Sequence, residues 1–227
     1  MRQFAIFDLD DTLLDFTRGE KEGITAILKK YGVTDLDHGL QVYLAHNHDV
    51  WHQIEQGADR DALLNSRFQV VFARLGITVD GVALQQEYLN LVAHNFYTVP
   101  GAADLLAHLH QAGVHLIVGT NGTKATQMNR VIGAHLDQYF DQVYISESVG
   151  YPKPDARFFE TIFSHNPDMT TTNTVMVGDS LQSDILGAQH AGLDSIWYNP
   201  KHLPLTTNLQ PIANVDNFKA IQNLILA

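Results

Sequence analysis

Short apolar runs that end in polar residues recur along the chain and constrain its fold more than any other feature. Between these runs lie stretches whose apolar residues have the spacing of a helix. In one of them, Leu105, Leu106 and Leu109 follow Pro100-Gly101, and Gly113 marks the end of the predicted helix. Each run has the length of a strand that is buried on both faces. The alternation predicts an α/β fold, a parallel sheet sandwiched by helices with right-handed crossovers. The five predicted strands are Phe4–Phe7, Val114–Gly119, Val143–Ile145, Val175–Gly178 and Ser195–Tyr198.

Residues from about 17 to 97 interrupt this alternation. Three stretches there have the spacing of amphipathic helices, and Ile77-Thr78-Val79 is too short for a strand. A chain of 227 residues has room for a core with a substantial insertion. We therefore predict a core of residues 1–15 and 98–227 and a helical insert of residues 16–97. The three helical stretches are Ile24 to Tyr31, Leu63 to Leu75 and Leu84 to Val92.

Three further features concern the second half of the chain. Ser180 is a candidate cap for a helix that buries Ile185 and Leu186 and ends at Gly192. The segment from Pro200 to Pro211 is rich in turn residues and predicts a loop. The last helix is predicted near Phe218–Leu226.

The composition excludes several classes of protein. Lys and Arg number 14 against 25 Asp and Glu, a net charge of −11, which argues against a binder of nucleic acid polymers. The absence of cysteine excludes disulfides, a thiolate nucleophile and Cys-ligated metal sites. The apolar run Phe4–Phe7 is too short for a signal peptide or a membrane span, so we expect a cytoplasmic protein.

Polar side chains follow four of the predicted strands where each strand ends. In open parallel sheets, ligands bind beyond the carboxyl ends of the strands, so we expect these residues to converge on one rim. Together they offer carboxylates, a lysine, a hydroxyl and backbone N–H groups exposed by glycine. The sets are Asp8-Leu9-Asp10-Asp11-Thr12, Thr120-Asn121-Gly122, Ser146-Glu147 with Lys153-Pro154-Asp155, and Gly178-Asp179-Ser180 with Asp184.

The charge of this rim predicts a metal ion. Asp8, Asp10, Asp179 and Asp184 carry −4 when all are ionised, against +1 from Lys153. A phosphate dianion would not bind there without a divalent cation, and an incomplete set of oxygen ligands beside a phosphate favours Mg²⁺. We expect the ion to bridge Asp8, Asp179 and a phosphate oxygen.

Each set taken alone has an ordinary explanation as a turn or a helix start. The functional interpretation is favoured because all four sets follow strands and together supply a nucleophile, an acid, metal ligands and phosphate donors. His48 and His52 have the i, i+4 spacing of a zinc pair. No third His or acidic residue follows at a sequence spacing typical of a zinc site, so we expect these two histidines to pack on the surface or within the insert.

The order of these motifs resembles the haloacid dehalogenase superfamily. Its signature is Asp-x-Asp-x-Thr/Val after the first strand, then Thr or Ser, then Lys, then Gly-Asp-x-x-x-x-Asp. The corresponding residues here are Asp8 to Thr12, Thr120, Lys153 and Gly178 to Asp184. The match follows the same order along the whole chain, and it implies a Rossmann-like core with an α-helical cap in the first insertion position.

Further stretches resemble one branch, the bacterial pyrimidine 5′-nucleotidases. One departure from that branch is Tyr151-Pro152 before Lys153, where its members carry smaller residues. The resembling stretches are Asn47-His48-Asp49-Val50-Trp51, Ile145-Ser146-Glu147-Ser148-Val149-Gly150, Ser183-Asp184-Ile185-Leu186-Gly187-Ala188, Ala191-Gly192-Leu193 and Trp197-Tyr198-Asn199.

Chemistry and resemblance together imply catalytic roles. Asp8 is the nucleophile that forms an aspartyl-phosphate. Asp10 protonates the leaving oxygen and then takes a proton from water, and its backbone carbonyl also reaches the metal. Lys153 neutralises charge on the phosphate and the nucleophile, while Asp11 and Thr12 are turn and supporting residues.

The remaining site residues bind phosphate and metal. The Thr120 hydroxyl and the backbone amides of Asn121 and Gly122 hold phosphate oxygens. Asp179 ligates Mg²⁺ directly. Asp184 either contacts the metal, directly or through water, or orients Lys153.

These roles predict a Mg²⁺-dependent phosphatase, a nucleoside 5′-monophosphatase that prefers UMP, dUMP or dTMP. A dehalogenase is disfavoured because that reaction needs neither Asp10 nor a divalent metal. The alternatives are a sugar-phosphate phosphatase or phosphomutase of the same superfamily, or a phosphate-ligand sensor without catalysis. Specificity is expected from the insert, with Phe16, Asn47 and Trp51 as candidate substrate contacts.

Overall fold

The computed structural model describes residues 1–227, which divide into a core unit and a helical unit. The core unit is Met1–Asp15 with Phe96–Ala227, and the helical unit is Phe16–Asn95. The second crossover lies two residues before the predicted boundary, because Tyr97 O accepts a backbone hydrogen bond from Asp15 at 2.8 Å.

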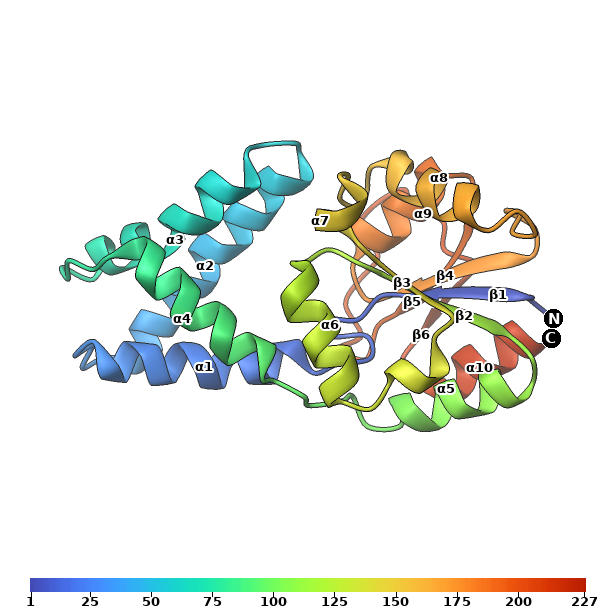
Figure 1. The fold of residues 1–227 in the computed structure, drawn as a ribbon, viewed down its shortest axis with the longest axis horizontal. Helices are drawn as coiled ribbons and strands as arrows, with labels where there is room; N and C mark the ends of the chain where they lie inside the picture. The colour runs from blue at the N-terminus through green and yellow to red at the C-terminus, as the bar shows by residue number, and fades with distance from the viewer. The chain divides into compact units, whose positions relative to one another are not determined.

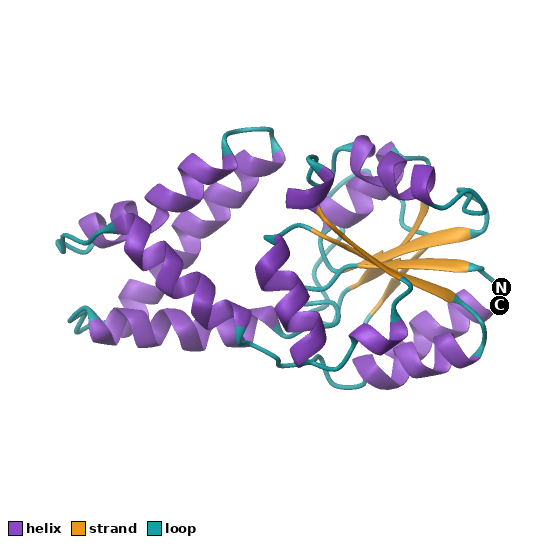
Figure 2. Ribbon diagram, viewed as in Figure 1, coloured by secondary structure: helices purple, strands orange, loops and turns teal.

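A six-stranded sheet forms the centre of the core unit (Figures 1 and 2). Its order is β3-β2-β1-β4-β5-β6, and every neighbouring pair is parallel. The chain moves from β1 outward to β3 and then returns to the other side of β1. The carboxyl ends of β1, β2 and β4 therefore meet at the topological switch point, where such sheets bind ligands. The strands are β1 (Phe4–Phe7), β2 (His115–Thr120), β3 (Gln142–Ile145), β4 (Thr174–Gly178), β5 (Asp194–Tyr198) and β6 (Ala213–Val215).

Alternate residues of β1 face two different helical layers. Ala5 and Phe7 pack with apolar residues of α5 and α10, whereas Phe4 and Ile6 pack with residues of α8 and α9. Figure 1 shows these helix pairs on opposite faces of the sheet. Burial on both faces explains why this run is uniformly apolar. The helices are α5 (Ala102–Gln111), α6 (Lys124–Gly133), α7 (Ser146–Val149), α8 (Ala156–His165), α9 (Leu186–His190) and α10 (Phe218–Leu226), with a 3₁₀ turn at Asp137–Tyr139 and a π-helical turn at Leu181–Ile185.

Four helices build the helical unit around an apolar core of its own. The second, third and fourth helices each begin after an aspartate whose side chain accepts the backbone N–H of the third residue of the helix. These caps are Asp35, Asp59 and Asp80. No helix of the chain combines the length and the apolar composition that a membrane span requires. The helices are α1 (Phe16–Lys30), α2 (Leu36–Glu55), α3 (Arg60–Arg74) and α4 (Gly81–Ala93).

The predicted α/β fold with a helical insertion is confirmed, and all five predicted strands lie within a residue of their expected positions. Strand β6 was not predicted, because its sequence Ala213-Asn214-Val215 is too short to form an apolar run. Apolar spacing identified three of the four helices in the insertion. Ser180 does accept a hydrogen bond from Ser183 N–H, but the helix that it caps opens with a π-helical turn before α9 begins.

Candidate active site

Asp8 is the first residue beyond β1. Its N–H donates to Val177 O at 2.9 Å, so the sheet backbone holds it at the switch point. The chain then turns tightly, with Asp11 in the left-handed region at φ 57°, which Asp tolerates better than most residues. This turn brings the buried Thr12 to Asp179, whose N–H donates to the threonine hydroxyl at 3.1 Å.

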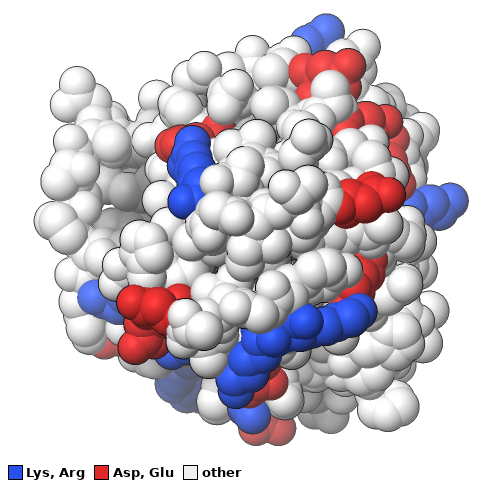
Figure 3. Space-filling model, turned by 90° about the vertical axis from the view of Figure 1, so that its left-hand side faces the viewer, with Lys and Arg blue, Asp and Glu red and all other residues white.

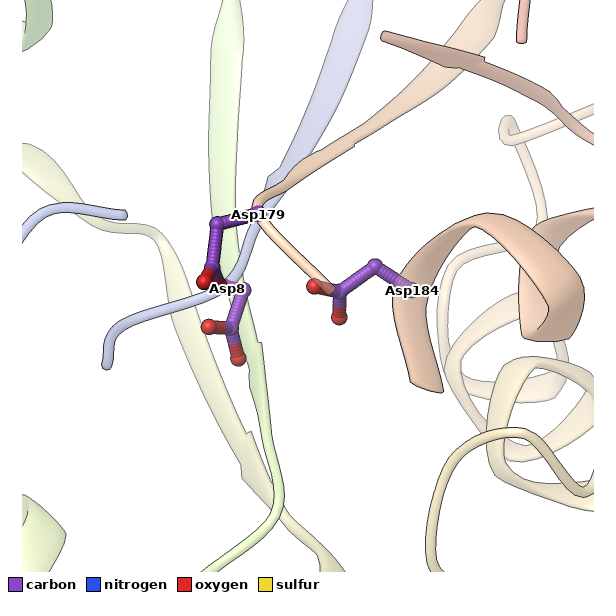
Figure 4. Close-up of side chains that lie close together, drawn as sticks. All are labelled: Asp8, Asp179 and Asp184. Carbon is purple, nitrogen blue, oxygen red and sulfur yellow. The ribbon is translucent and has the colours of Figure 1, made fainter. Parts of the chain in front are cut away.

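Three carboxylates converge at the carboxyl end of the sheet (Figure 4). Asp8 follows β1, Asp179 follows β4, and Asp184 projects from the π-helical turn. One carboxylate oxygen from each lies within 4.8 Å of the other two. Residues 171 positions apart in sequence thus form one acidic cluster, because β1 and β4 are neighbours in the sheet.

Lys153 lies among these carboxylates and is 1% exposed. Its Nζ donates to Asp8 Oδ1 at 2.7 Å, to Asp184 Oδ1 at 2.6 Å and to Gly119 O at 2.6 Å. All three donor positions of the ammonium are therefore satisfied. The other oxygen of Asp184 accepts the Ser180 N–H at 3.0 Å, which fixes this carboxylate against the lysine.

Asn121 fixes the backbone of Lys153. Its Nδ2 donates to Lys153 O at 2.8 Å, and its Oδ1 accepts the Lys153 N–H at 2.9 Å. The side chain of Asn121 is therefore committed to the lysine loop. The backbone N–H of Asn121, which was predicted to contact phosphate, is not used in these two hydrogen bonds.

Burial and crowded charges shift the pKa values of this cluster. Burial is the largest cause that raises the pKa of Asp8 to about 7, with Lys153 opposing it and Asp184 and Asp10 adding to it. Burial, followed by Asp184 and Asp8, raises the pKa of Asp179 well above its usual value. Burial lowers the pKa of Lys153, but Asp184 and Asp8 outweigh that effect and raise it overall. The lysine stays cationic while the carboxylates resist ionising together.

The donor set fits a divalent cation. Its oxygens come from three carboxylates, which are hard ligands of the kind that Mg²⁺ prefers. A cation beside Asp8 and Asp179 would favour their ionised forms and offset the carboxylate repulsion that adds to the effect of burial on their pKa values. His48 and His52 belong to no cluster of three potential metal ligands, and His52 Nε2 lies 2.9 Å from Gln56 Nε2.

The predicted phosphate-binding loop follows β2 in the same rim. Thr120 is buried, and its hydroxyl accepts a hydrogen bond from Gln127 Nε2 at 2.9 Å. The Gly122 N–H donates to Ser146 Oγ at 3.2 Å, which links this loop to the end of β3.

Gln127 and Arg130 are two site residues that the sequence analysis missed. Both are buried on α6, and both contact Asp10. No strand-end motif marks them, since they lie inside a helix. The signal that could have drawn attention to them is a polar pair at i, i+3 next to the buried Val131.

Asn47 occupies a buried polar network in the helical unit. Its Nδ2 donates to Glu20 Oε1 at 3.0 Å, and its Oδ1 accepts from Arg67 Nη1 at 2.5 Å. Glu20 Oε1 also accepts from the hydroxyls of Tyr43 at 3.0 Å and Tyr88 at 3.1 Å. The amide that was predicted to read a base therefore has partners at both ends within its own unit.

Trp51 and Phe16, the other two candidate specificity residues, are each partly buried. Trp51 packs against an apolar cluster with Ile54 and Leu64, and Arg60 lies over its ring at 5.9 Å from the centroid. Phe16 is the first residue of α1 and packs against the main apolar cluster of the helical unit.

Charge on the surface is mixed. In Figure 3, Lys and Arg are scattered with Asp and Glu among uncharged side chains on the face toward the viewer. Over the whole chain, 25 acidic residues outnumber 14 basic ones.

Known proteins are similar to this chain in sequence and in fold. A family model described as haloacid dehalogenase-like hydrolase matches residues 5–198. The pyrimidine 5′-nucleotidase PynA of Streptococcus pneumoniae is 39% identical over 218 residues, which is 96% of this chain and 92% of that protein. The pyrimidine 5′-nucleotidase YjjG of Escherichia coli is 31% identical over 223 residues, 98% of this chain and 97% of that protein.

A solved structure is similar to this chain in fold over its whole length. The protein YfnB from Bacillus subtilis, in a crystal structure bound to magnesium, has a TM-score of 0.92 and 29% identity, covering 100% of this chain and 99% of that one. The resemblance read from the motifs is confirmed. The chain belongs to the haloacid dehalogenase-like hydrolases.

Proposed function

We propose that this hydrolase is a Mg²⁺-dependent phosphatase that cleaves nucleoside 5′-monophosphates through an aspartyl-phosphate, with a preference for pyrimidine nucleotides. The observation that carries the proposal is the contact of Lys153 Nζ with both Asp8 and Asp184 at the switch point. It sets a cation beside a carboxylate that is positioned to act as a nucleophile. The names of PynA and YjjG support the choice of pyrimidine nucleotides.

In the proposed first step, an Asp8 carboxylate oxygen attacks phosphorus. The new acyl-phosphate bond forms as the ester P–O bond breaks. Lys153 holds Asp8 through Oδ1 and offsets negative charge on the phosphoryl group. Since Asp184 and Asn121 fix the lysine from two sides, the cation needs no rearrangement as the charge develops.

Asp10 is the proposed general acid and base. It would donate a proton to the leaving alkoxide, then accept a proton from the water that attacks the acyl-phosphate and releases phosphate and Asp8. Its side chain is 28% exposed, so substrate and water can reach it. The carboxyl group starts protonated, becomes a carboxylate in the first step and is protonated again in the second, so each turnover restores its starting state.

The remaining rim residues would bind phosphate. The Thr120 hydroxyl and the N–H groups of Asn121 and Gly122 are the proposed donors to its oxygens. The hydroxyl can donate its own proton while it accepts from Gln127, because a threonine offers both functions. The Gly122 N–H would exchange its present partner, Ser146 Oγ, for a phosphate oxygen.

Asp8, Asp179 and the Asp10 backbone carbonyl would hold Mg²⁺. When bound, the ion would offset negative charge and polarise a phosphoryl oxygen. We assign Asp184 to orienting Lys153, because its Oδ1 accepts from Lys153 Nζ at 2.6 Å while the Ser180 N–H holds its Oδ2 in place.

An ester screen with Mg²⁺ tests the proposal. UMP, dUMP and dTMP should give higher kcat/KM than purine nucleotides and sugar phosphates. Equal or higher values for sugar phosphates would instead favour a sugar-phosphate phosphatase. A protein that binds phosphate without releasing it from any ester would be a sensor rather than an enzyme.

A further inference from the structure

Helix α6 directs two buried polar side chains toward Asp10. Gln127 Nε2 donates to Asp10 Oδ2 at 2.9 Å, and Arg130 Nη1 forms an ion pair with Asp10 Oδ1. Gln127 is 2% exposed and Arg130 is fully buried. Their i, i+3 spacing puts them on one face of the helix, so both oxygens of Asp10 contact a single rigid element.

The two side chains also support each other. Arg130 Nη1 donates to Gln127 Oε1 at 2.9 Å, and Gln127 Nε2 lies 2.9 Å from Thr120 Oγ1. The Gln127 side chain packs closely against the backbone of Gly122. The space between them is too small for a side chain at position 122, because an added Cβ would lie 2.6 Å from Gln127 Cγ. The network therefore connects the carboxylate of Asp10 to the hydroxyl of Thr120.

We infer that Gln127 and Arg130 are positioning residues that fix the carboxylate of Asp10 for proton transfer, an inference that rests on the proposed function. A carboxylate has about four lone-pair sites, so two hydrogen bonds to α6 leave sites on both oxygens for the transferred proton. Proton transfer needs heavy atoms within hydrogen-bond distance, and a displacement of about 1 Å can lower a rate about 100-fold. The two contacts on α6 remove the rotation that would cause such a displacement.

A purely structural role is the competing explanation. A buried arginine needs a carboxylate partner, and its loss would lower stability whatever Asp10 does. That explanation predicts equal rate losses on all substrates, because only the folded fraction would change. A positioning role predicts larger losses for esters with poor leaving groups, since these need the proton most.

The test compares kcat/KM for a nucleoside 5′-monophosphate and for p-nitrophenyl phosphate. This parameter is suited to the question because it reports formation of the aspartyl-phosphate, before the hydrolysis that both substrates share. Arg130→Met should lower kcat/KM for the nucleotide by about 10- to 100-fold and for p-nitrophenyl phosphate much less. Arg130→Lys, which retains the cation, should recover part of the loss. Val131→Ala, a packing change in the same helix, should lower Tm and leave the ratio of the two kcat/KM values unchanged.

A double-mutant cycle gives a second readout. If Arg130 acts through Asp10, adding Arg130→Met to Asp10→Asn should change kcat/KM for the nucleotide by less than about twofold. If Arg130→Met does not fold, Gln127→Met carries both readouts; it removes the contact with Asp10 Oδ2 together with the hydrogen bonds of Gln127 to Thr120 and Arg130, and leaves the Arg130–Asp10 ion pair. An unchanged substrate ratio, or the same fractional loss in both backgrounds, would overturn the inference while leaving the phosphatase proposal intact. A wild-type protein that hydrolyses neither ester would overturn both.

Discussion

Lys153 Nζ lies 2.7 Å from Asp8 Oδ1, although 145 positions separate the two residues in the chain. The parallel order of β2, β1 and β4 makes this contact possible, because it brings the loops that follow different strands to one edge. The contact joins a buried cation to a carboxylate whose pKa burial raises to about 7.

Asp8→Asn should abolish turnover while the protein still folds, because a neutral amide cannot attack phosphorus. The measurement is phosphate release from UMP together with a circular dichroism spectrum. Asp11→Asn is the matched control: it changes a carboxylate in the same turn, at a left-handed position that Asn also tolerates, and should keep activity. Full activity of Asp8→Asn would rule out the covalent mechanism.

Mg²⁺ should raise Tm, and EDTA should abolish activity until Mg²⁺ is restored. A ligand that binds only the folded state stabilises it by RT ln(1 + [L]/Kd). Asp179→Asn should reduce the Tm shift at a given Mg²⁺ concentration, since it removes a proposed ligand. An undiminished shift in this variant would place the ion elsewhere.

Asp10→Asn should retain phosphate binding yet lose about 10²- to 10⁴-fold in kcat/KM for a nucleotide, the usual range for general acid–base catalysis. The loss should be smaller for p-nitrophenyl phosphate, whose leaving group needs little protonation. Equal losses on the two substrates would assign Asp10 a structural role.

The stability of the metal-free protein should depend on pH through Asp8. Its folded pKa of about 7 exceeds the ordinary aspartate value of 3.8, so the folded state favours the protonated form. The associated stabilisation is fully present below pH 3.8 and is lost as the pH rises through about 7.

Thermal melts in EDTA should reveal this dependence. Asp8→Asn cannot ionise, so its Tm relative to wild type should increase between about pH 5 and pH 8. The exposed Asp168→Asn serves as the control and should give a constant Tm difference over the same range. A Tm difference for Asp8→Asn that falls with pH would contradict the raised pKa.

Trp51→Ala should raise KM for a pyrimidine nucleotide about 5- to 150-fold, as expected for a lost stacking contact of about 1–3 kcal/mol. Hydrolysis of p-nitrophenyl phosphate should be largely spared. Leu63→Ala is the matched control, because Leu63 packs against the same apolar cluster without offering a ring. Equal losses on both substrates, with a lower Tm, would show that Trp51 only packs the helical unit.

Asn47→Ala should lower Tm as well as raise KM for the nucleotide. It removes an acceptor from Arg67 and a donor to Glu20 in a buried network, and an unsatisfied buried group costs about 1–3 kcal/mol. Kinetics and melting curves on the same preparation separate the two effects. An unchanged KM with a lowered Tm would withdraw Asn47 from substrate recognition.

The sequence by itself determined five of the six strands and the polar residues at the end of each of four of them. Strand Phe4–Phe7 and the acids that follow it are encoded within a few neighbouring residues. Burial on both faces leaves a continuous apolar run, and the end of the strand is marked where polar residues resume. The same local pattern located Thr120 at the end of its strand and Lys153 and Asp179 beyond theirs.

Only the tertiary structure decided which side chains meet. Gln127 and Arg130 lie 117 and 120 positions from Asp10, and their helix has no local feature that points to a distant carboxylate. The side-chain amide of Asn47 has the donor and the acceptor that reading a base requires. In the structure, both groups form hydrogen bonds with residues of neighbouring helices, Glu20 and Arg67. Local periodicity records which face of an element is buried, whereas hydrogen bonds between polar groups depend on the packing of elements that are far apart in sequence.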